Sequence, residues 1–261
     1  MRANMLNLFD LKNKTAVVTG AGSGIGRAMA EAMAEAGANV ACLDIDRKRA
    51  EETSELVRSM DVESIPVTCD VSSDKLVGKA FEQIKARFGR VDVLFNNAGI
   101  SGQNVNTHEV SIEEWNRVIS TDLTGIFLCA KEAIGIMLEQ KRPGKIINVA
   151  SIFGYCAGAP LLKVPPYHAA KGGIISLTRE MALEYAQNGI NVNCILPGFF
   201  ATNLSSRMMD EKFVANLGLS IPIGRVGVPE EIKGTALFLA SAASNYLTGS
   251  IIAVDGGYIC K

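Results

Sequence analysis

The sequence predicts a doubly wound α/β fold, in which a seven-stranded parallel sheet carries helices on both faces. Short apolar runs alternate with longer helical patterns along all 261 residues, as successive βαβ units require. The runs are rich in Val and Ile and apolar on both sides, which is typical of strands covered by helices on both faces. Because no linker, repeat or low-complexity tract divides the chain, we expect one domain spanning residues 1–261.

The expected elements follow one another in strict alternation. The strands are expected at residues 15–20, 39–44, 64–70, 91–96, 144–151, 190–197 and 250–257, and the helices at 24–36, 47–59, 73–88, 111–140, 168–188 and 229–241. Ser111 and Glu114 have the spacing of a capping box at the start of one helix. Gly37 suits a helix end, and Pro229 suits a first helical turn.

One segment breaks the alternation. Residues from about 198 to 228 have no strand pattern and only a short helical one, between the sixth strand and the last helix. Long excursions of this kind in compact domains are often lids over an active site, so we expect a substrate lid here. Met208 and Met209 within it either contact substrate or pack against the protein.

Composition narrows the choice of partners. Lys and Arg total 26 and Asp and Glu total 27, so a net charge of −1 argues against nucleic acid or an anionic membrane as partner. No run of eighteen apolar residues and no signal-peptide pattern occur, which favours a cytoplasmic protein. Six cysteines without a CxxC spacing and only two histidines predict reduced thiols and no metal site.

The first chemical signal is the glycine-rich stretch TGAGSGIG at 19–26, which follows a strand and opens a helix. Glycines at such a turn let backbone N–H groups approach a pyrophosphate, and the helix N-terminus supplies partial positive charge. The stretch therefore predicts a nucleotide site, although turns also collect glycine for structural reasons. No GxxxxGK[ST] pattern indicates a nucleoside triphosphate.

Asp44 predicts which dinucleotide is bound. It ends the second strand, eighteen residues after Gly26, where a carboxylate can accept both hydroxyls of an adenosine ribose. The same charge repels a 2′-phosphate, and Ser23 offers no cation to hold one. NAD is therefore favoured over NADP, with Arg47 and Arg49 keeping NADP as the alternative. The structural alternative is that Asp44 only caps the next helix.

Tyr167 and Lys171 stand four residues apart in a helical stretch, so both side chains lie on one helix face. A cation about 4 Å from a phenolate stabilises it by about 4 kcal/mol at an effective dielectric constant of about 20. The phenol is then suited to exchange a proton with an alcohol. Ser151 ends the fifth strand, and ligands of such sheets bind at the carboxyl ends of strands.

Taken together, the chain resembles the short-chain dehydrogenase/reductase family of the single-domain type. The matching motifs, in order and spacing, are TGAGSGIG at 19–26, NNAG at 96–99, Ser151, YHAAK at 167–171 and PGFFAT at 197–202. The match extends over essentially the whole chain. It implies a Rossmann-type fold, a nicotinamide cofactor, a secondary alcohol or ketone as small-molecule substrate, and a homotetramer.

The resemblance also implies roles for individual residues. Ser151 would hold the substrate oxygen, Tyr167 would exchange the proton, and Lys171 would tune Tyr167 and bind the nicotinamide ribose. The implied cofactor-binding residues are Gly20, Ser23, Gly24, Ile25, Gly26, Asp44, Asp70, Val71, Asn97, Gly99, Tyr167, Lys171, Pro197, Gly198, Phe200 and Thr202.

Asp122 is the first departure from the family pattern, because members usually carry Asn there. The Asn is thought to help hold a water that links the Lys to solvent. Asp can accept from that water, and its charge would also stabilise protonated Lys171. We therefore count Asp122 among the catalytic residues and expect an altered pH profile; the alternative is that it only packs at a helix bend.

The second departure is the loop at 154–166, which is about three residues longer than the usual connection and ends in Pro165-Pro166. It borders the expected substrate position, so Tyr155, Leu161 and Lys163 are the first candidates for specificity. Surface decoration is the alternative interpretation.

The substrate class is the least determined feature. A sugar, polyol or sugar acid is the first expectation, because Asp at the position of Asp122 resembles some gluconate- and polyol-type members. A hydroxysteroid and a 3-oxoacyl thioester are the alternatives within the family. A catalytically inactive NAD-binding module is the alternative from another class, and a complete Ser-Tyr-Lys set argues against it.

Overall fold

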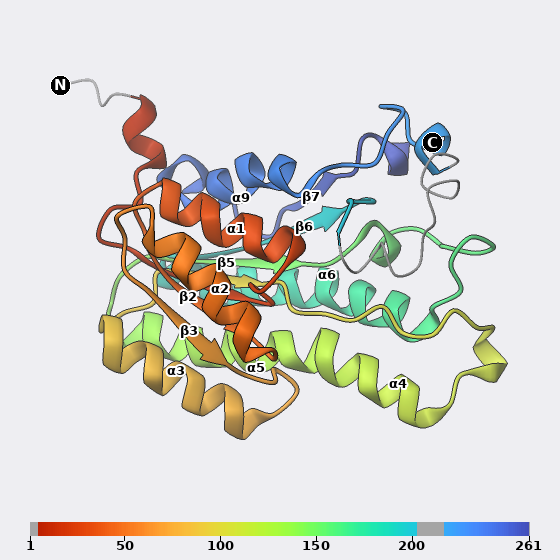
Figure 1. Cartoon of the computed structure of the whole chain (residues 1–261), viewed down its shortest axis with the longest axis horizontal. Coiled ribbons are helices and arrows are strands. Elements are labelled where there is room, and N and C mark those ends of the chain that lie inside the picture. Colours follow the sequence, from red (N-terminus) through yellow and green to blue (C-terminus); the bar gives the residue numbers. More distant parts are fainter. Residues whose placement is uncertain (1–4, 203–216, 261) are drawn as a thin grey trace.

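In a computed structural model that describes residues 5–202 and 217–260, seven strands form one parallel sheet in the order β3-β2-β1-β4-β5-β6-β7 (Figure 1). Every neighbouring pair is parallel. The predicted doubly wound fold is confirmed. The strands are β1 (Thr15–Thr19), β2 (Asn39–Asp44), β3 (Ser64–Thr68), β4 (Val93–Asn96), β5 (Gly144–Val149), β6 (Ile190–Pro197) and β7 (Ile251–Val254).

Helices cover both faces of this sheet, which explains why the central strands are apolar on both sides (Figure 1). Helices α1 and α9 pack on one face together with Val57 of α2, while α3, α5 and the end of α6 pack on the other. The helices are α1 (Gly24–Glu35), α2 (Arg47–Arg58), α3 (Asp74–Phe88), α4 (Ile112–Ile119), α5 (Gly125–Glu139), α6 (Pro165–Tyr185) and α9 (Lys233–Ala240).

The order of the strands determines where the predicted binding site lies. β1 pairs with β2 on one side and with β4 on the other, so the connections leave β1 and β4 in opposite directions and open a crevice between them. The glycine-rich turn after β1, Asp44 at the end of β2 and Ser151 after β5 therefore share one edge of the sheet.

Three helices differ from their predicted bounds. The helix expected at 229–241 is a 3-10 turn at Pro229–Ile232 followed by α9, which begins at Lys233. The single helix expected at 111–140 is divided into α4, a five-residue π-helical turn at Ser120–Thr124 and α5. Helix α6 begins at Pro165 rather than at residue 168, with prolines in its first turn. Since proline has no N–H to leave unsatisfied there, Pro165 and Pro166 start the helix and do not merely stiffen the loop.

The predicted capping box at α4 is only half formed. Ser111 Oγ accepts the Glu114 N–H at 3.1 Å, but the Glu114 carboxylate does not return this bond. It accepts instead from the Gln103 N–H at 2.8 Å and from the Arg117 guanidinium. Glu114 thereby attaches the loop after β4 to α4.

Part of the expected lid lies within the described residues. Met208 and Met209 lie outside them. The two flanks of the excursion are joined, because Ala201 N–H donates to the Gly227 carbonyl at 2.8 Å and Gly227 N–H donates to the Phe199 carbonyl at 2.9 Å. The lid role itself stays a prediction.

All six cysteines are free thiols, and burial raises the pKa of Cys42, Cys69 and Cys194 to about 11. Such thiols are protonated and unreactive at neutral pH. Among residues 5–202 and 217–260, no helix is long and apolar enough to cross a bilayer, and no cluster of His, Cys, Asp and Glu is suited to a metal ion.

A row of hydrogen bonds between buried polar side chains joins α6 to the sheet. The Asn96 amide on β4 donates to Asn148 Oδ1 on β5 at 2.9 Å, and the Asn148 amide donates to Thr178 Oγ1 on α6 at 2.9 Å. All three side chains are fully buried. Replacing Asn148 leaves the buried Asn96 amide without a partner, whereas the Thr178 hydroxyl keeps its bond to the Ile174 carbonyl.

We expect Asn148→Ala to lower the free energy of unfolding by about 2–3 kcal/mol, since an orphaned buried donor costs about 1–3 kcal/mol and the shortened side chain leaves a small cavity. Urea denaturation followed by circular dichroism measures this. Asn39→Ala is the matched control, because Asn39 makes an exposed bond to the Glu63 N–H, and its effect should stay within about 1 kcal/mol. Equal losses of unfolding free energy in both variants would contradict a stabilising role for the hydrogen bonds among Asn96, Asn148 and Thr178.

Candidate active site

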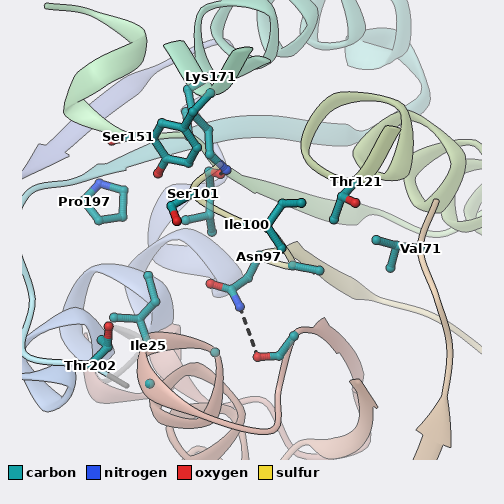
Figure 2. Close-up of a pocket in the computed structure, with 18 of the residues that line it drawn as sticks. Ile25, Val71, Asn97, Ile100, Ser101, Thr121, Ser151, Lys171, Pro197 and Thr202 are labelled. Atoms are coloured by element: carbon teal, nitrogen blue, oxygen red, sulfur yellow. Dashed lines mark hydrogen bonds between the residues drawn. The ribbon is translucent and has the colours of Figure 1, made fainter. Parts of the chain in front are cut away.

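A cavity of about 710 Å³ opens along the carboxyl ends of the strands (Figure 2). Every predicted cofactor-binding residue lines it, as do Ser151, Tyr167 and Lys171. Asp122 is fully buried and lies behind Lys171, outside the lining. The structure thus brings the predicted site residues together, while the role of each stays a prediction.

The glycine-rich turn has the backbone that an anion site requires. Gly20 and Gly24 have φ values of +64° and +56°, which disfavour any other residue. A Cβ on Gly20 would also lie 3.0 Å from Ala98 Cα. Helix α1 starts after Ser23 without a side-chain cap, so its first N–H groups are available to a bound pyrophosphate.

Thr19 positions this turn, and the sequence analysis missed it. Its hydroxyl accepts the N–H groups of Asn97 and Ala98 at 2.9 and 3.0 Å and donates to the Phe95 carbonyl. The Asn97 amide donates back to the carbonyls of Thr19 and Gly20 (Figure 2). The only signal for Thr19 was its place between a strand and the first glycine.

Asp44 faces the cavity in a fixed orientation. Its two carboxylate oxygens accept the N–H groups of Gly22 and Asp46, each at 2.9 Å. Helix α2 is capped by Asp46, which accepts the Arg49 N–H, so the alternative that Asp44 is the cap is wrong. Arg49 also lines the cavity and pairs with Asp46 at 3.3 Å.

Ser151 and Tyr167 are the polar groups predicted to hold a reacting oxygen, and both line the cavity. Ser151 Oγ accepts the Phe153 N–H at 3.1 Å, which leaves the hydroxyl proton free to be donated to a ligand. Tyr167 lies one turn before Lys171 on α6, and the Lys171 ammonium lies 5.3 Å from the centre of the Tyr167 ring. In Figure 2, Ser101, Ser151 and Lys171 group together, away from Val71 and Thr121.

A buried ion pair stands behind this group. Lys171 Nζ lies 3.3 Å from Asp122 Oδ2 and donates to the Val149 carbonyl at 3.2 Å. Asp122 Oδ1 accepts the Ile100 N–H at 2.8 Å. A Cβ on Gly99 would lie 2.9 Å from Asp122 Oδ2 and 3.3 Å from Lys171 Nζ, so the pair requires glycine there.

The pair fixes the charge of the lysine. Burial alone would lower the pKa of Lys171, but the Asp122 carboxylate, with a smaller contribution from Tyr167, outweighs burial and holds that pKa above its ordinary value. Burial raises the pKa of Asp122, against the opposing effects of Lys171 and the Ile100 N–H. At neutral pH, Lys171 is therefore a buried ammonium beside a phenol.

The substrate end differs from the prediction. Tyr155 is 68% exposed, and neither it nor Leu161 nor Lys163 lines the cavity. Leu162 and Val164 line it instead. The Lys163 backbone is turned the other way, because its N–H donates to Asn104 Oδ1 and its carbonyl accepts the Val105 N–H, both at 2.8 Å.

Comparisons with known proteins agree with this geometry. A family profile described as "Enoyl-(Acyl carrier protein) reductase" matches residues 20–259. The solved structure of a short-chain type dehydrogenase/reductase from Mycobacterium marinum has a TM-score of 0.95 at 37% identity and covers 99% of this chain and 100% of its own. This chain belongs to the short-chain dehydrogenase/reductase family. It is an oxidoreductase with a nicotinamide dinucleotide site.

Two further relatives bear on the cofactor and the substrate. A 3beta-hydroxysteroid dehydrogenase from Eggerthella lenta is 40% identical over 250 residues, which is 95% of this chain and 94% of the relative. A gluconate 5-dehydrogenase from Burkholderia cenocepacia, solved with NADP and tartrate, has a TM-score of 0.92 at 33% identity and covers 99% of this chain and 100% of its own.

Proposed function

We propose that this oxidoreductase interconverts a secondary alcohol and its ketone, with Ser151, Tyr167 and Lys171 as the catalytic residues. The observation that carries the proposal is the convergence of a hydroxyl donor, a phenol and a buried ammonium at one end of a cleft suited to a dinucleotide. Of these groups, only the phenol can both take and return a proton readily beside a fixed cation.

In the direction of oxidation, Ser151 donates a hydrogen bond to the alcohol oxygen and holds that oxygen beside Tyr167, while keeping its own proton. The phenolate of Tyr167 removes the hydroxyl proton while the C–H hydrogen leaves with its electron pair. The bound nicotinamide supplies the hydride acceptor. Lys171 stabilises the phenolate and would hold the nicotinamide ribose. Reduction of the ketone reverses each step.

Asp122 acts in this proposal through Lys171. It keeps the ammonium protonated in a dry environment and fixes its position through the bond to the Ile100 N–H. A buried charge without its partner is strongly disfavoured, so the carboxylate makes the buried cation tolerable. Asp122 is thus a positioning residue for the cation that acts on Tyr167.

For the cofactor, we propose NAD over NADP. The support is Asp44, whose carboxylate is held at the cavity by two backbone N–H groups. A relative solved with NADP shows that the family also accommodates the phosphorylated form, and Arg49 lines the cavity nearby. The choice therefore depends on whether Asp44 or Arg49 dominates at the ribose.

For the substrate, the names of the relatives include both a gluconate and a steroid alcohol. The first agrees with the expectation of a sugar, polyol or sugar acid, and the second with the hydroxysteroid alternative. Both are secondary alcohols, which is the class proposed here.

We also propose that the protein forms one domain, assembles as a homotetramer and resides in the cytoplasm. Six free thiols support a reducing compartment. Light scattering coupled to size-exclusion chromatography measures the assembly.

Tyr167→Phe tests the proton-transfer step, because it retains the ring and removes only the hydroxyl. We expect turnover to fall by about 100-fold or more, while NAD affinity stays within about threefold. Tyr155→Phe is the matched control, since that tyrosine lies outside the cavity lining, and it should leave turnover unchanged. Near-normal turnover in Tyr167→Phe would place the acid–base group elsewhere.

Asp44→Ala tests the cofactor choice. We expect the wild-type kcat/KM to favour NAD by about tenfold or more, and the variant to lose NAD affinity while gaining NADP activity, since a repelling charge is removed. Steady-state kinetics with both cofactors measure the ratio. A wild-type enzyme that already prefers NADP would refute the assignment.

Asp122→Asn tests the ion pair at constant size. Without the carboxylate, Lys171 loses the main effect that opposes burial, so its pKa falls and the alkaline limb of the kcat/KM profile should move to lower pH. We expect less than about a tenfold loss of turnover near neutrality. Glu113→Gln, the same charge change at an exposed site on α4, is the control. Superimposable profiles would show that Asp122 only packs.

A further inference from the structure

The substrate end of the cavity has a wall of consistent chemistry. We propose that the reacting carbon belongs to a predominantly apolar alcohol, such as an alicyclic or steroid-like one, rather than to an open-chain polyol or sugar acid. This inference rests on the proposed function, because it names the substrate class of the same site.

Apolar side chains flank the two residues that hold the reacting oxygen. Two buried apolar residues come immediately after Ser151, and the loop before Tyr167 supplies one buried and one half-buried apolar residue. The wall residues are Ile152, Phe153, Leu162, Val164 and Phe199, and all of them line the cavity. All except Val164 belong to one hydrophobic cluster against which Tyr167 also packs. A ligand held by Ser151 and Tyr167 is therefore placed against an apolar surface.

The wall is rigid. Phe153 and Phe199 meet edge to face, with ring centres 5.7 Å apart. Leu162 N–H donates to the Gly158 carbonyl at 2.9 Å, and the Val164 carbonyl accepts the His168 N–H at 3.1 Å. Two further hydrogen bonds, at the backbone N–H and carbonyl of Lys163, hold the same loop in place without a ligand.

The charged side chains that line the cavity also argue against a sugar acid. The charged side chains among its described lining residues are Asp44, Arg49, Asp70, Arg117 and Lys171. Each of the three cations already has a carboxylate partner: Arg49 pairs with Asp46, Arg117 with Glu114 and Lys171 with Asp122. A substrate carboxylate would therefore meet no unpaired cation in this part of the chain.

Solvation favours an apolar substrate over a polyhydroxylated one at this wall. Each hydroxyl of a polyol that turns to this wall gives up its bonds to water without replacement, which is unfavourable. A saturated ring face gains by leaving water at the same surface. One oxygen of the substrate still finds its partners, in Ser151 and Tyr167.

The first measurement compares kcat/KM for 4-methylcyclohexanol and a 3β-hydroxysteroid with that for sorbitol and gluconate, at saturating NAD and NADP. 2-Butanol serves as the small reference alcohol. We expect at least one ring alcohol to exceed both open-chain polyols by about tenfold or more. A kcat/KM for sorbitol or gluconate equal to or above those of the ring alcohols would overturn the inference.

The second measurement introduces polarity into the wall. Leu162→Asn is close to isosteric and should lower the ratio of ring-alcohol to polyol kcat/KM by about fivefold or more. Leu161→Asn is the matched control, since Leu161 packs against the same hydrophobic cluster without lining the cavity, and it should leave the ratio unchanged. An unchanged ratio in Leu162→Asn, or an equal fall in Leu161→Asn, would contradict the role of the wall.

A binding experiment separates the two proposals. Calorimetry on the NADH-loaded enzyme compares 4-methylcyclohexanone with 5-ketogluconate. If no alcohol is oxidised but the cyclic ketone binds more tightly, the proposed function fails and the apolar wall stands. If 2-butanol is oxidised but the sugar acid binds more tightly, the wall inference fails and the proposed function stands.

Discussion

The buried pair of Lys171 and Asp122 is the interaction on which the site depends. It joins four parts of the fold: Lys171 on α6, Asp122 in the π-helical turn, the Gly99–Ile100 segment after β4 and the Val149 carbonyl of β5. Breaking a buried pair by removing one partner typically costs about 3–5 kcal/mol, because the remaining charge is left uncompensated. Lys171 can remain a buried ammonium because the fold holds the Asp122 carboxylate beside it.

The cavity around this pair has two chemically distinct ends. The cofactor end is made of glycines, backbone N–H groups and the oriented Asp44 carboxylate, which suit phosphate and ribose. The proposed substrate end is made of Phe153, Leu162, Val164 and Phe199. In the proposed function, Ser151 and Tyr167 act where the cofactor and the substrate carbon meet.

Much of this was predictable from the sequence, because strand runs and the glycine-rich turn are local patterns. The π-helical turn that carries Asp122 was not, since a helical period does not reveal an irregularity of five residues. Nor was the direction of the loop before Tyr167, which depends on tertiary bonds of Lys163 to Asn104 and Val105. Sequence reasoning therefore found the loop but chose Tyr155, Leu161 and Lys163 where the structure places Leu162 and Val164. The Glu114 carboxylate likewise accepts a hydrogen bond from the Gln103 N–H of a distant loop, and a local capping pattern cannot reveal this contact.

The protonation state of Lys171 tests the account most directly. Nitrogen-15 NMR of enzyme labelled at lysine Nζ, with Lys171→Met to assign the signal, follows the ammonium as pH rises. An ordinary lysine is half deprotonated near pH 10.4. The account predicts that the Lys171 signal still belongs to an ammonium at that pH, held by Asp122. An amine signal for Lys171 at pH 8, while the enzyme remains folded, would contradict it.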